Sequence, residues 1–169
     1  MNLSYAFTPY DINGKTVIRP MLPVTLKGNS TEFPTALLVD SGADFSMIRR
    51  EIVEDAFGID ISKLKGTSKS QGIAGETIEV AFVTLTMVFG YGRLYFREDI
   101  PFQVPLNPDK NPPLSLIGRD PFFYRYRVDF RMGYTDDSSL GKFVIYPEKH
   151  RSAEKYSKPM KIKSNKLEK

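Results

Sequence analysis

Two carboxylates that lie close together in the sequence are the first side chains that could take part in catalysis. Asp40 ends the aliphatic run 36–39, Ser41 and Gly42 follow it, and Asp44 comes shortly after. Burying a carboxylate at the end of an apolar strand costs free energy, so such a group is usually hydrogen-bonded or has a role in binding or catalysis. One interpretation is an Asx-type turn or a helix N-cap, in which Asp40 or Ser41 accepts from backbone N–H groups. The other is a reactive carboxylate at the mouth of a strand.

Two further segments favour the second interpretation. The segment 113–120 reads PLSLIGRD, so an aliphatic run ends in glycine, arginine and aspartate. Between the two acidic segments, the glycine-bracketed GIAG at 72–75 precedes a long apolar strand. In this order the segments resemble the retropepsin family of aspartic proteases, the single-domain class that includes the retroviral proteases. The resemblance spans residues 16 to 133.

The resemblance implies an all-β fold: a retropepsin-like acid protease barrel with a flap hairpin and one short helix after the Gly-Arg-Asp motif. It also implies an aspartic endopeptidase, a peptide hydrolase in which two carboxylates share one proton and activate water. The chain has a single Asp-Ser-Gly triplet, so the resemblance implies a homodimer with one Asp40 from each chain on the two-fold axis. A catalytically inactive dimerisation or peptide-binding module remains the alternative.

The resemblance also assigns roles to individual positions. Ser41 matches a hydroxyl that hydrogen-bonds across the dimer beneath the acids, and Asp44 matches an acid that touches substrate and forms an ion pair with Arg119. A planar guanidinium suits such a carboxylate partner. Phe45 stands where retroviral enzymes often have a polar residue, so we expect a more apolar pocket there. The implied substrate-binding residues are Leu38, Gly42, Asp44, Phe45, Gly72, Ile73, Ala74, Gly75, Leu114 and Leu116, with Ile117 behind them and with Ile73 and Ala74 at the flap tip.

Short strands at fairly regular spacing are the elements expected to position these residues. Pro20 and Pro23 predict an edge strand or a bulge in the first of them. The chain before it, residues 1–15, reads as a loosely attached arm. In the first half of the chain we expect strands within 15–40 joined by a polar turn, and then helical turns that end near Gly58. A hairpin tip at 71–77 should precede a long strand that ends at residue 90. In the second half we expect strands at 93–106 and 114–118, a helix within 121–127, and a closing hairpin made of 128–134 and 141–146.

The amino-acid composition excludes several kinds of metal site and catalytic site. The chain has 169 residues, 41% of them hydrophobic, which suits one domain with a single core. Cysteine is absent, which excludes a disulfide framework, a thiolate zinc site and a cysteine nucleophile. The only histidine is His150, near the C-terminal end, so a Ser-His-Asp set is not expected. We expect no cofactor and no metal, and a cytoplasmic location fits a chain without cysteine.

The positive charge is concentrated at one end. Residues 148–169 contain eight Lys or Arg and three Glu, and they read as a basic, solvated tail after a protease domain at 16–147. The expected partners are a second copy of the chain and a peptide or protein substrate. We expect no nucleic-acid partner. No apolar run approaches the roughly 20 residues of a membrane helix, so a membrane partner is not expected either.

Overall fold

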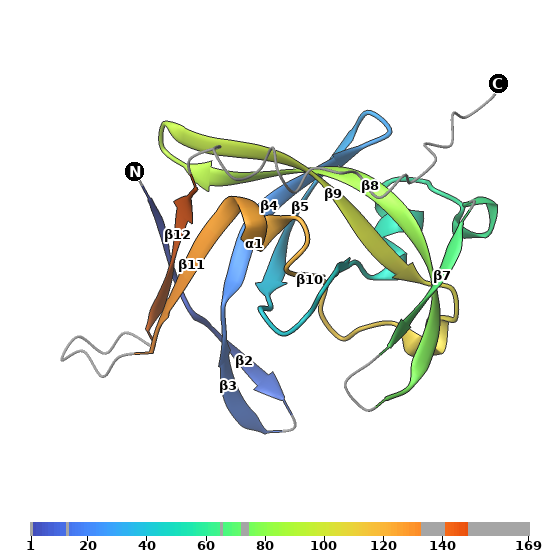
Figure 1. Ribbon diagram of the computed structural model, residues 1–169, viewed down its shortest axis with the longest axis horizontal. Coiled ribbons are helices and arrows are strands. Elements are labelled where there is room, and N and C mark those ends of the chain that lie inside the picture. Colours follow the sequence, from blue (N-terminus) through green and yellow to red (C-terminus); the bar gives the residue numbers. More distant parts are fainter. Residues whose placement is uncertain (1, 13, 65, 72–74, 133–140, 149–169) are drawn as a thin grey trace.

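The structure is a computed structural model that describes residues 2–12, 14–64, 66–71, 75–132 and 141–148 (Figure 1). It is built mainly from strands, with four short helical segments. The strands are β1 Leu3–Ala6, β2 Thr8–Ile12, β3 Lys15–Arg19, β4 Met21–Gly28, β5 Thr31–Val39, β6 Ser46–Met47, β7 Thr67–Gln71, β8 Thr77–Tyr91, β9 Leu94–Pro105, β10 Leu116–Ile117, β11 Tyr126–Arg131 and β12 Lys142–Pro147. The helical segments are the π-helix η1 Ile52–Ala56, the 3-10 helices η2 Ile61–Lys63 and η3 Pro108–Lys110, and the α-helix α1 Phe122–Arg125.

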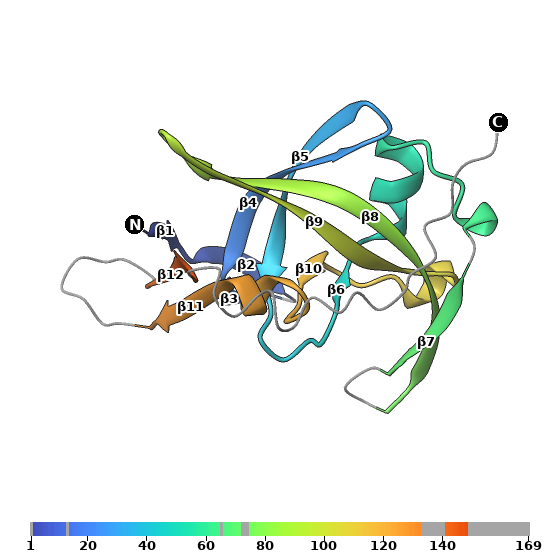
Figure 2. The same cartoon turned by 45° about the horizontal axis from the view of Figure 1, so that its top comes forward.

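Six of the strands close into a barrel. The order around it is β4, β5, β10, β6, β9 and β8, and β8 pairs with β4 to complete the ring. The seventh strand of this sheet, β7, pairs with β8 over the first part of that strand and projects from the barrel (Figures 1 and 2). The all-β barrel that the sequence predicts is therefore confirmed.

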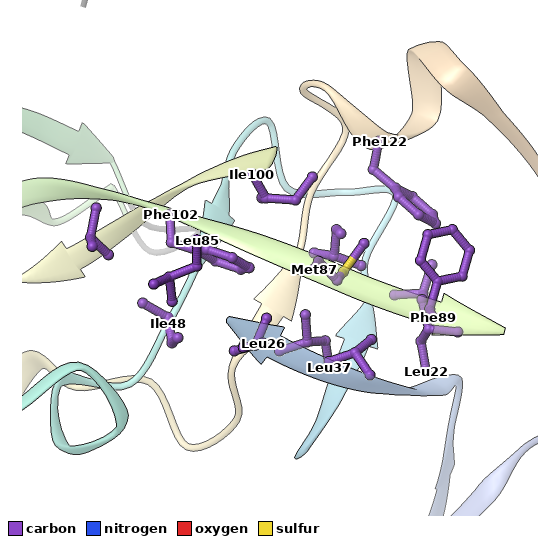
Figure 3. Close-up of a cluster of buried hydrophobic side chains, with 14 of the residues drawn as sticks. Leu22, Leu26, Leu37, Ile48, Leu85, Met87, Phe89, Ile100, Phe102 and Phe122 are labelled. Carbon is purple, nitrogen blue, oxygen red and sulfur yellow. The ribbon is translucent and has the colours of Figure 1, made fainter. Parts of the chain in front are cut away.

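The long strands β8 and β9 form the largest hairpin and supply much of the core. Alternate residues of β8 from Val83 to Phe89 are buried, as a half-buried strand requires. Figure 3 shows their side chains meeting those of β4, β5, β9 and α1 inside the barrel. Gly90 makes the turn between the strands possible, because a Cβ there would lie 2.0 Å from the Leu94 carbonyl oxygen.

A second sheet of three strands, in the order β1, β12, β11, packs beside the barrel. The expectation of a loose N-terminal arm is wrong for this segment, because β1 pairs with β12 and β2 pairs with β3. Leu3 and Phe7 are buried, while Ser4 and Ala6 between them are exposed. This alternation is the period-two pattern of a strand, and burial of the apolar side chains holds the segment in place.

The prolines near the start of β4 predicted an edge strand or a bulge, and the structure agrees with this prediction only in part. From Met21 to Pro23 the strand pairs with β5 alone, so Pro23 lies where no second neighbour needs its missing N–H. From Val24 onward β4 also pairs with β8, so this half is an inner strand of the closed barrel. The edge-strand prediction therefore holds for the first residues and is wrong for the rest.

The helical predictions are close to the structure. The segment η1 ends at its C-cap Phe57, next to Gly58, whose φ of +62° favours glycine. The helix predicted within 121–127 is the short α1, and β11 begins directly after it. No helix among the described residues is long and apolar enough to cross a membrane.

Candidate active site

The parallel pair β5 and β10 positions Asp40 at the end of β5. Leu38 lies opposite Leu116 and Val39 opposite Ile117 in this pair. The Asp40 N–H donates to the Ile117 carbonyl oxygen at 3.0 Å, which continues the pairing by one residue beyond β5. The two motifs that the sequence singled out are therefore neighbours in space.

The Asp40 carboxylate is half-buried and only partly satisfied. Its Oδ1 accepts from the Gly42 N–H at 2.8 Å, and the Asp40 carbonyl oxygen accepts from the Ala43 N–H at 3.3 Å. This is the Asx-type turn of the first interpretation. Among the described residues the Gly42 amide is the only donor to the carboxylate, so Oδ2 has no partner there. The turn orients the carboxylate and leaves one oxygen for another group.

The loop after Asp40 crosses the residues after β10 at close range. The Arg119 N–H donates to the Ala43 carbonyl oxygen at 2.8 Å, and the Asp120 N–H donates to the Asp44 carbonyl oxygen at 2.9 Å. Gly118 lies at the crossing, where a Cβ would come within 2.4 Å of the Phe45 carbonyl oxygen. Only glycine allows this approach, so the glycine of the LIGRD segment has a steric reason.

Two charged side chains lie beside this crossing. Arg119 Nη2 donates to Asp44 Oδ1, and both side chains are more than half exposed. An exposed ion pair contributes little to stability, about 0–1 kcal/mol. Its effect is to hold Asp44 at the rim of the site, close to the Asp40 turn.

Apolar side chains flank the turn on the face opposite the core. Leu38 and Leu116 are cross-strand neighbours and are half-buried, whereas Val39 and Ile117 next to them are buried. Phe45 is also half-buried. A separate pocket of about 210 Å³ lies further along β5, beside Leu114, and Asp40 does not line it. Ser41 and Gly42 are exposed in the single chain.

The predicted flap has its two strands in the structure. Strand β7 pairs antiparallel with the start of β8, and Gln71 lies opposite Thr77. Residues 72–74 of the predicted tip, Gly72, Ile73 and Ala74, lie outside the described residues. Gly75, on the return side, has a φ of +78°. The next residue, Glu76, accepts a hydrogen bond from Lys110 in η3 at 2.7 Å, which raises the pKa of the lysine.

Two buried hydroxyls support the site and were missed by the sequence analysis. Ser46 Oγ accepts from the Gly118 N–H at 3.1 Å, and Ser115 Oγ accepts from the Arg49 N–H at 3.0 Å. Both serines are at least 96% buried. A serine within an apolar run is the only signal the sequence offers for such a role. Within the described ranges, no group of three or more His, Cys, Asp or Glu residues could hold a metal ion.

Comparison with known proteins agrees with this geometry. The sequence model of a family described as aspartyl protease matches residues 22–120, which include β5, the Asp40 turn, the β7–β8 hairpin and β10. The chain belongs to this aspartyl protease family. The match runs through Asp120, so both segments at the crossing belong to the family domain. No curated protein matches the sequence significantly.

A solved structure has the same fold as this aspartyl protease family member. It is a retropepsin-like aspartic protease from Rickettsia conorii, with a TM-score of 0.53 and 21% sequence identity. The similarity covers 86% of this chain and 89% of the other. At this identity the likeness concerns the fold, which supports the retropepsin-like assignment.

Proposed function

We propose that this chain is an active aspartic endopeptidase that works as a homodimer. The observation that carries the proposal is the Asp40 turn, which presents a half-buried carboxylate with one oxygen unpartnered among the described residues. A single chain supplies one Asp-Ser-Gly triplet, so a symmetric dimer would supply the second carboxylate. The exposure of Ser41 and Gly42 in the single chain is consistent with a face that a second copy covers.

In the proposed reaction the two Asp40 carboxylates share one proton, because two like charges this close do not both ionise readily. The ionised carboxylate takes a proton from water, and the water oxygen attacks the carbonyl carbon of the peptide bond. The protonated carboxyl donates its proton to the carbonyl oxygen. The C–N bond of the resulting tetrahedral intermediate breaks as the amine nitrogen accepts a proton from the first aspartate. A hydroxyl of the intermediate returns a proton to the second aspartate, which leaves a carboxylic acid, an amine and the regenerated pair with its one shared proton.

Extended peptides with apolar side chains near the cleaved bond are the proposed substrates. The paired half-buried leucines Leu38 and Leu116, together with Phe45, offer apolar surface beside Asp40. Asp44, held by Arg119 at the rim, could accept from the N–H groups of a bound strand. The β7–β8 hairpin is the proposed cover over the peptide.

The test is cleavage of a mixed peptide library by wild type and by Asp40→Asn, from about pH 3 to pH 7, with pepstatin as an inhibitor. An asparagine Oδ1 can still accept from the Gly42 N–H, so the turn is retained while the shared proton is lost. We expect the wild type to cleave and Asp40→Asn to fall by at least about a thousandfold.

Asp55→Asn is the matched control, because Asp55 is exposed in η1 and lies outside the site. It should cleave like the wild type. A folded wild type that leaves the whole library intact would contradict the proposal and favour the inactive dimerisation or peptide-binding module. Equal cleavage by wild type and Asp40→Asn would remove Asp40 from the catalytic role.

A further inference from the structure

A pocket of about 210 Å³ lies beside the candidate active site and has no role in the proposed reaction. Its walls come from β2, β4, β5, the start of η1 and the segments that precede η1 and β10. The lining includes Tyr10, Met21, Thr35, Ala36, Arg49 and Leu114. The family match begins at Leu22, so one wall comes from chain that lies outside the matched segment.

Arg49 is the only charged residue among the described residues that line this pocket, and its backbone is fixed. Its N–H donates to the Ser115 hydroxyl at 3.0 Å, and its carbonyl oxygen accepts from the Ile52 N–H at 3.2 Å. In the described part of the chain, Arg49 forms an ion pair only with Glu51, 3.3 Å from Nε. Glu51 does not line the pocket, and it also accepts from Asn111 Nδ2 at 2.6 Å. A guanidinium has five N–H donors in a planar fork, so the Nη groups can bind a second carboxylate.

The rest of the lining suits a small apolar group. Met21, Ala36 and Leu114 offer carbon atoms, while Tyr10 and Thr35 carry hydroxyls that have no hydrogen-bond partner within the described ranges. Apolar walls with a few polar groups are typical of small-molecule sites. A cavity of about 150 Å³ holds a benzene ring, so this pocket has room for such a ring next to a carboxylate.

We propose that this pocket binds a carboxylate that carries a small apolar group, with the carboxylate on Arg49. The guanidinium matches the charge and the plane of the carboxylate, and the apolar walls contact the attached carbon atoms. The inference goes beyond the proposed function, because the pocket can be filled whether or not the chain cleaves peptides.

The position of the pocket gives this carboxylate two sources. Ala36 and Leu38 lie on the same face of β5, because side chains two residues apart in a strand point the same way. Leu114 lines the pocket two residues before Leu116, which is the cross-strand neighbour of Leu38. At about 3.3 Å per residue, Ala36 lies about 13 Å from Asp40, which is about four residues of an extended peptide. The carboxylate therefore belongs either to an acidic residue of a bound peptide or to a free small molecule.

The first test titrates benzoate into the full chain at neutral pH and follows the backbone amides by NMR. We expect saturable shifts at Thr35, Ala36 and Arg49, with a dissociation constant of about 2 mM or lower. Benzamide has the same ring without the charge, and it should bind at least about tenfold more weakly. Arg49→Gln should weaken benzoate binding by a similar factor. Arg93→Gln is the matched control, because Arg93 is exposed between β8 and β9, and it should bind like the wild type.

A second variant keeps the test independent of charge. Ala36→Leu places a larger side chain in the pocket, so the chain should fold, with an unchanged circular dichroism spectrum, and lose benzoate binding. Ala6→Leu makes the same change at an exposed position of β1 and should bind benzoate normally.

Three results would overturn the proposal. The first is wild-type affinity for benzoate in Arg49→Gln or in Ala36→Leu. The second is equal affinity of the wild type for benzoate and benzamide. The third is the absence of a saturable shift up to about 20 mM benzoate.

A further experiment identifies the source of the carboxylate, and this part rests on the proposed function. A peptide that the wild type cleaves is remade with Glu or Gln at one position at a time. If a peptide side chain fills the pocket, a position about four residues from the cleaved bond should favour Glu over Gln by at least about tenfold in kcat/KM. That preference should disappear in Arg49→Gln and remain in Arg93→Gln.

Benzoate binding without any preference for Glu assigns the pocket to a free carboxylate. If the wild type cleaves no peptide, the proposed function fails, whereas the benzoate titration still decides whether the pocket is a carboxylate site.

Discussion

Gly42 lies in the Asp40 turn and Gly118 lies at the crossing beside it, and the two positions require glycine for different reasons. A Cβ on Gly118 would meet backbone atoms of the crossing loop, with the Phe45 carbonyl oxygen at 2.4 Å. A Cβ on Gly42 would meet only the Asp40 Oδ1, at 3.1 Å. Backbone atoms cannot move aside as a flexible side chain can. A side chain at position 118 would therefore disturb the fold, whereas a side chain at position 42 would disturb the orientation of the Asp40 carboxylate.

We therefore expect Gly118→Ala to lower the free energy of unfolding by about 2 kcal/mol or more, because the crossing must open. Gly42→Ala should change that free energy by less than about 1 kcal/mol, yet reduce peptide cleavage by disturbing the Asp40 carboxylate. Urea denaturation and the cleavage assay separate the two effects. Equal losses of stability in both variants would show that the crossing is not the tight point.

At the scale of elements, a hydrogen-bonded cluster joins β9 to α1 and β11. The Tyr126 hydroxyl donates to Glu98 Oε1 at 2.6 Å, and Arg125 pairs with the other oxygen of the same carboxylate. The Glu98 side chain is only 14% exposed. Burial, and then the hydrogen bond to Glu98, raise the pKa of Tyr126 above its ordinary value. The start of β11 is therefore tied to the barrel by a phenol that must stay protonated.

This predicts a loss of stability in alkali. In the unfolded chain a tyrosine ionises near pH 10, while in the folded chain the pKa of Tyr126 is higher and burial raises that of Tyr5 to about 12. The stability that these groups contribute is fully present below about pH 10 and is lost as the pH rises above it. Urea midpoints measured between about pH 8 and pH 11 should show this fall.

Tyr126→Phe should be less stable at neutral pH by about 1–2 kcal/mol, because Glu98 loses a donor, and its alkaline loss should be shallower than that of the wild type. Tyr95→Phe is the control, since Tyr95 is 62% exposed. It should follow the wild-type curve. Identical alkaline curves for Tyr126→Phe and the wild type would show that Tyr126 ionises normally in the folded protein.

At the scale of the whole molecule, the proposed activity belongs to a pair of chains. If each active site needs one Asp40 from each subunit, a wild-type chain paired with an Asp40→Asn chain lacks one carboxylate. In an equimolar mixture with free subunit exchange, only about a quarter of the dimers are wild type on both sides.

We expect the activity of that mixture, measured at constant wild-type concentration plus an equal amount of Asp40→Asn, to fall to about half. At constant total chain it should fall to about a quarter of the undiluted wild type. A mixture with Asp55→Asn should keep full activity. If the Asp40→Asn mixture keeps half of the activity at constant total chain, each chain works alone and the shared site is wrong.

The sequence alone was sufficient for the family and the fold class, and it singled out the two segments that meet at the Asp40 turn. Asp40 and the LIGRD segment carry local signals, because a strand end, a turn and a glycine each leave a mark on neighbouring residues. The strands β8 and β9, the turns of η1 and the short α1 were also predicted, since each depends on a short-range pattern. The alternation of Leu3, Tyr5 and Phe7 was present in the sequence too, but it was read as an arm.

Only the tertiary structure decided what depends on distant partners. The closure of β4 onto β8, the position of β12 between β1 and β11, and the Ser46 hydroxyl beneath Gly118 all join residues far apart in the chain. The alternation of apolar and polar residues in a strand shows which face is buried, but it does not show which other strand will pair with its edge. For the same reason the sequence predicted the Asp40 turn, whereas its contacts with the segment after β10 became visible only in the folded chain.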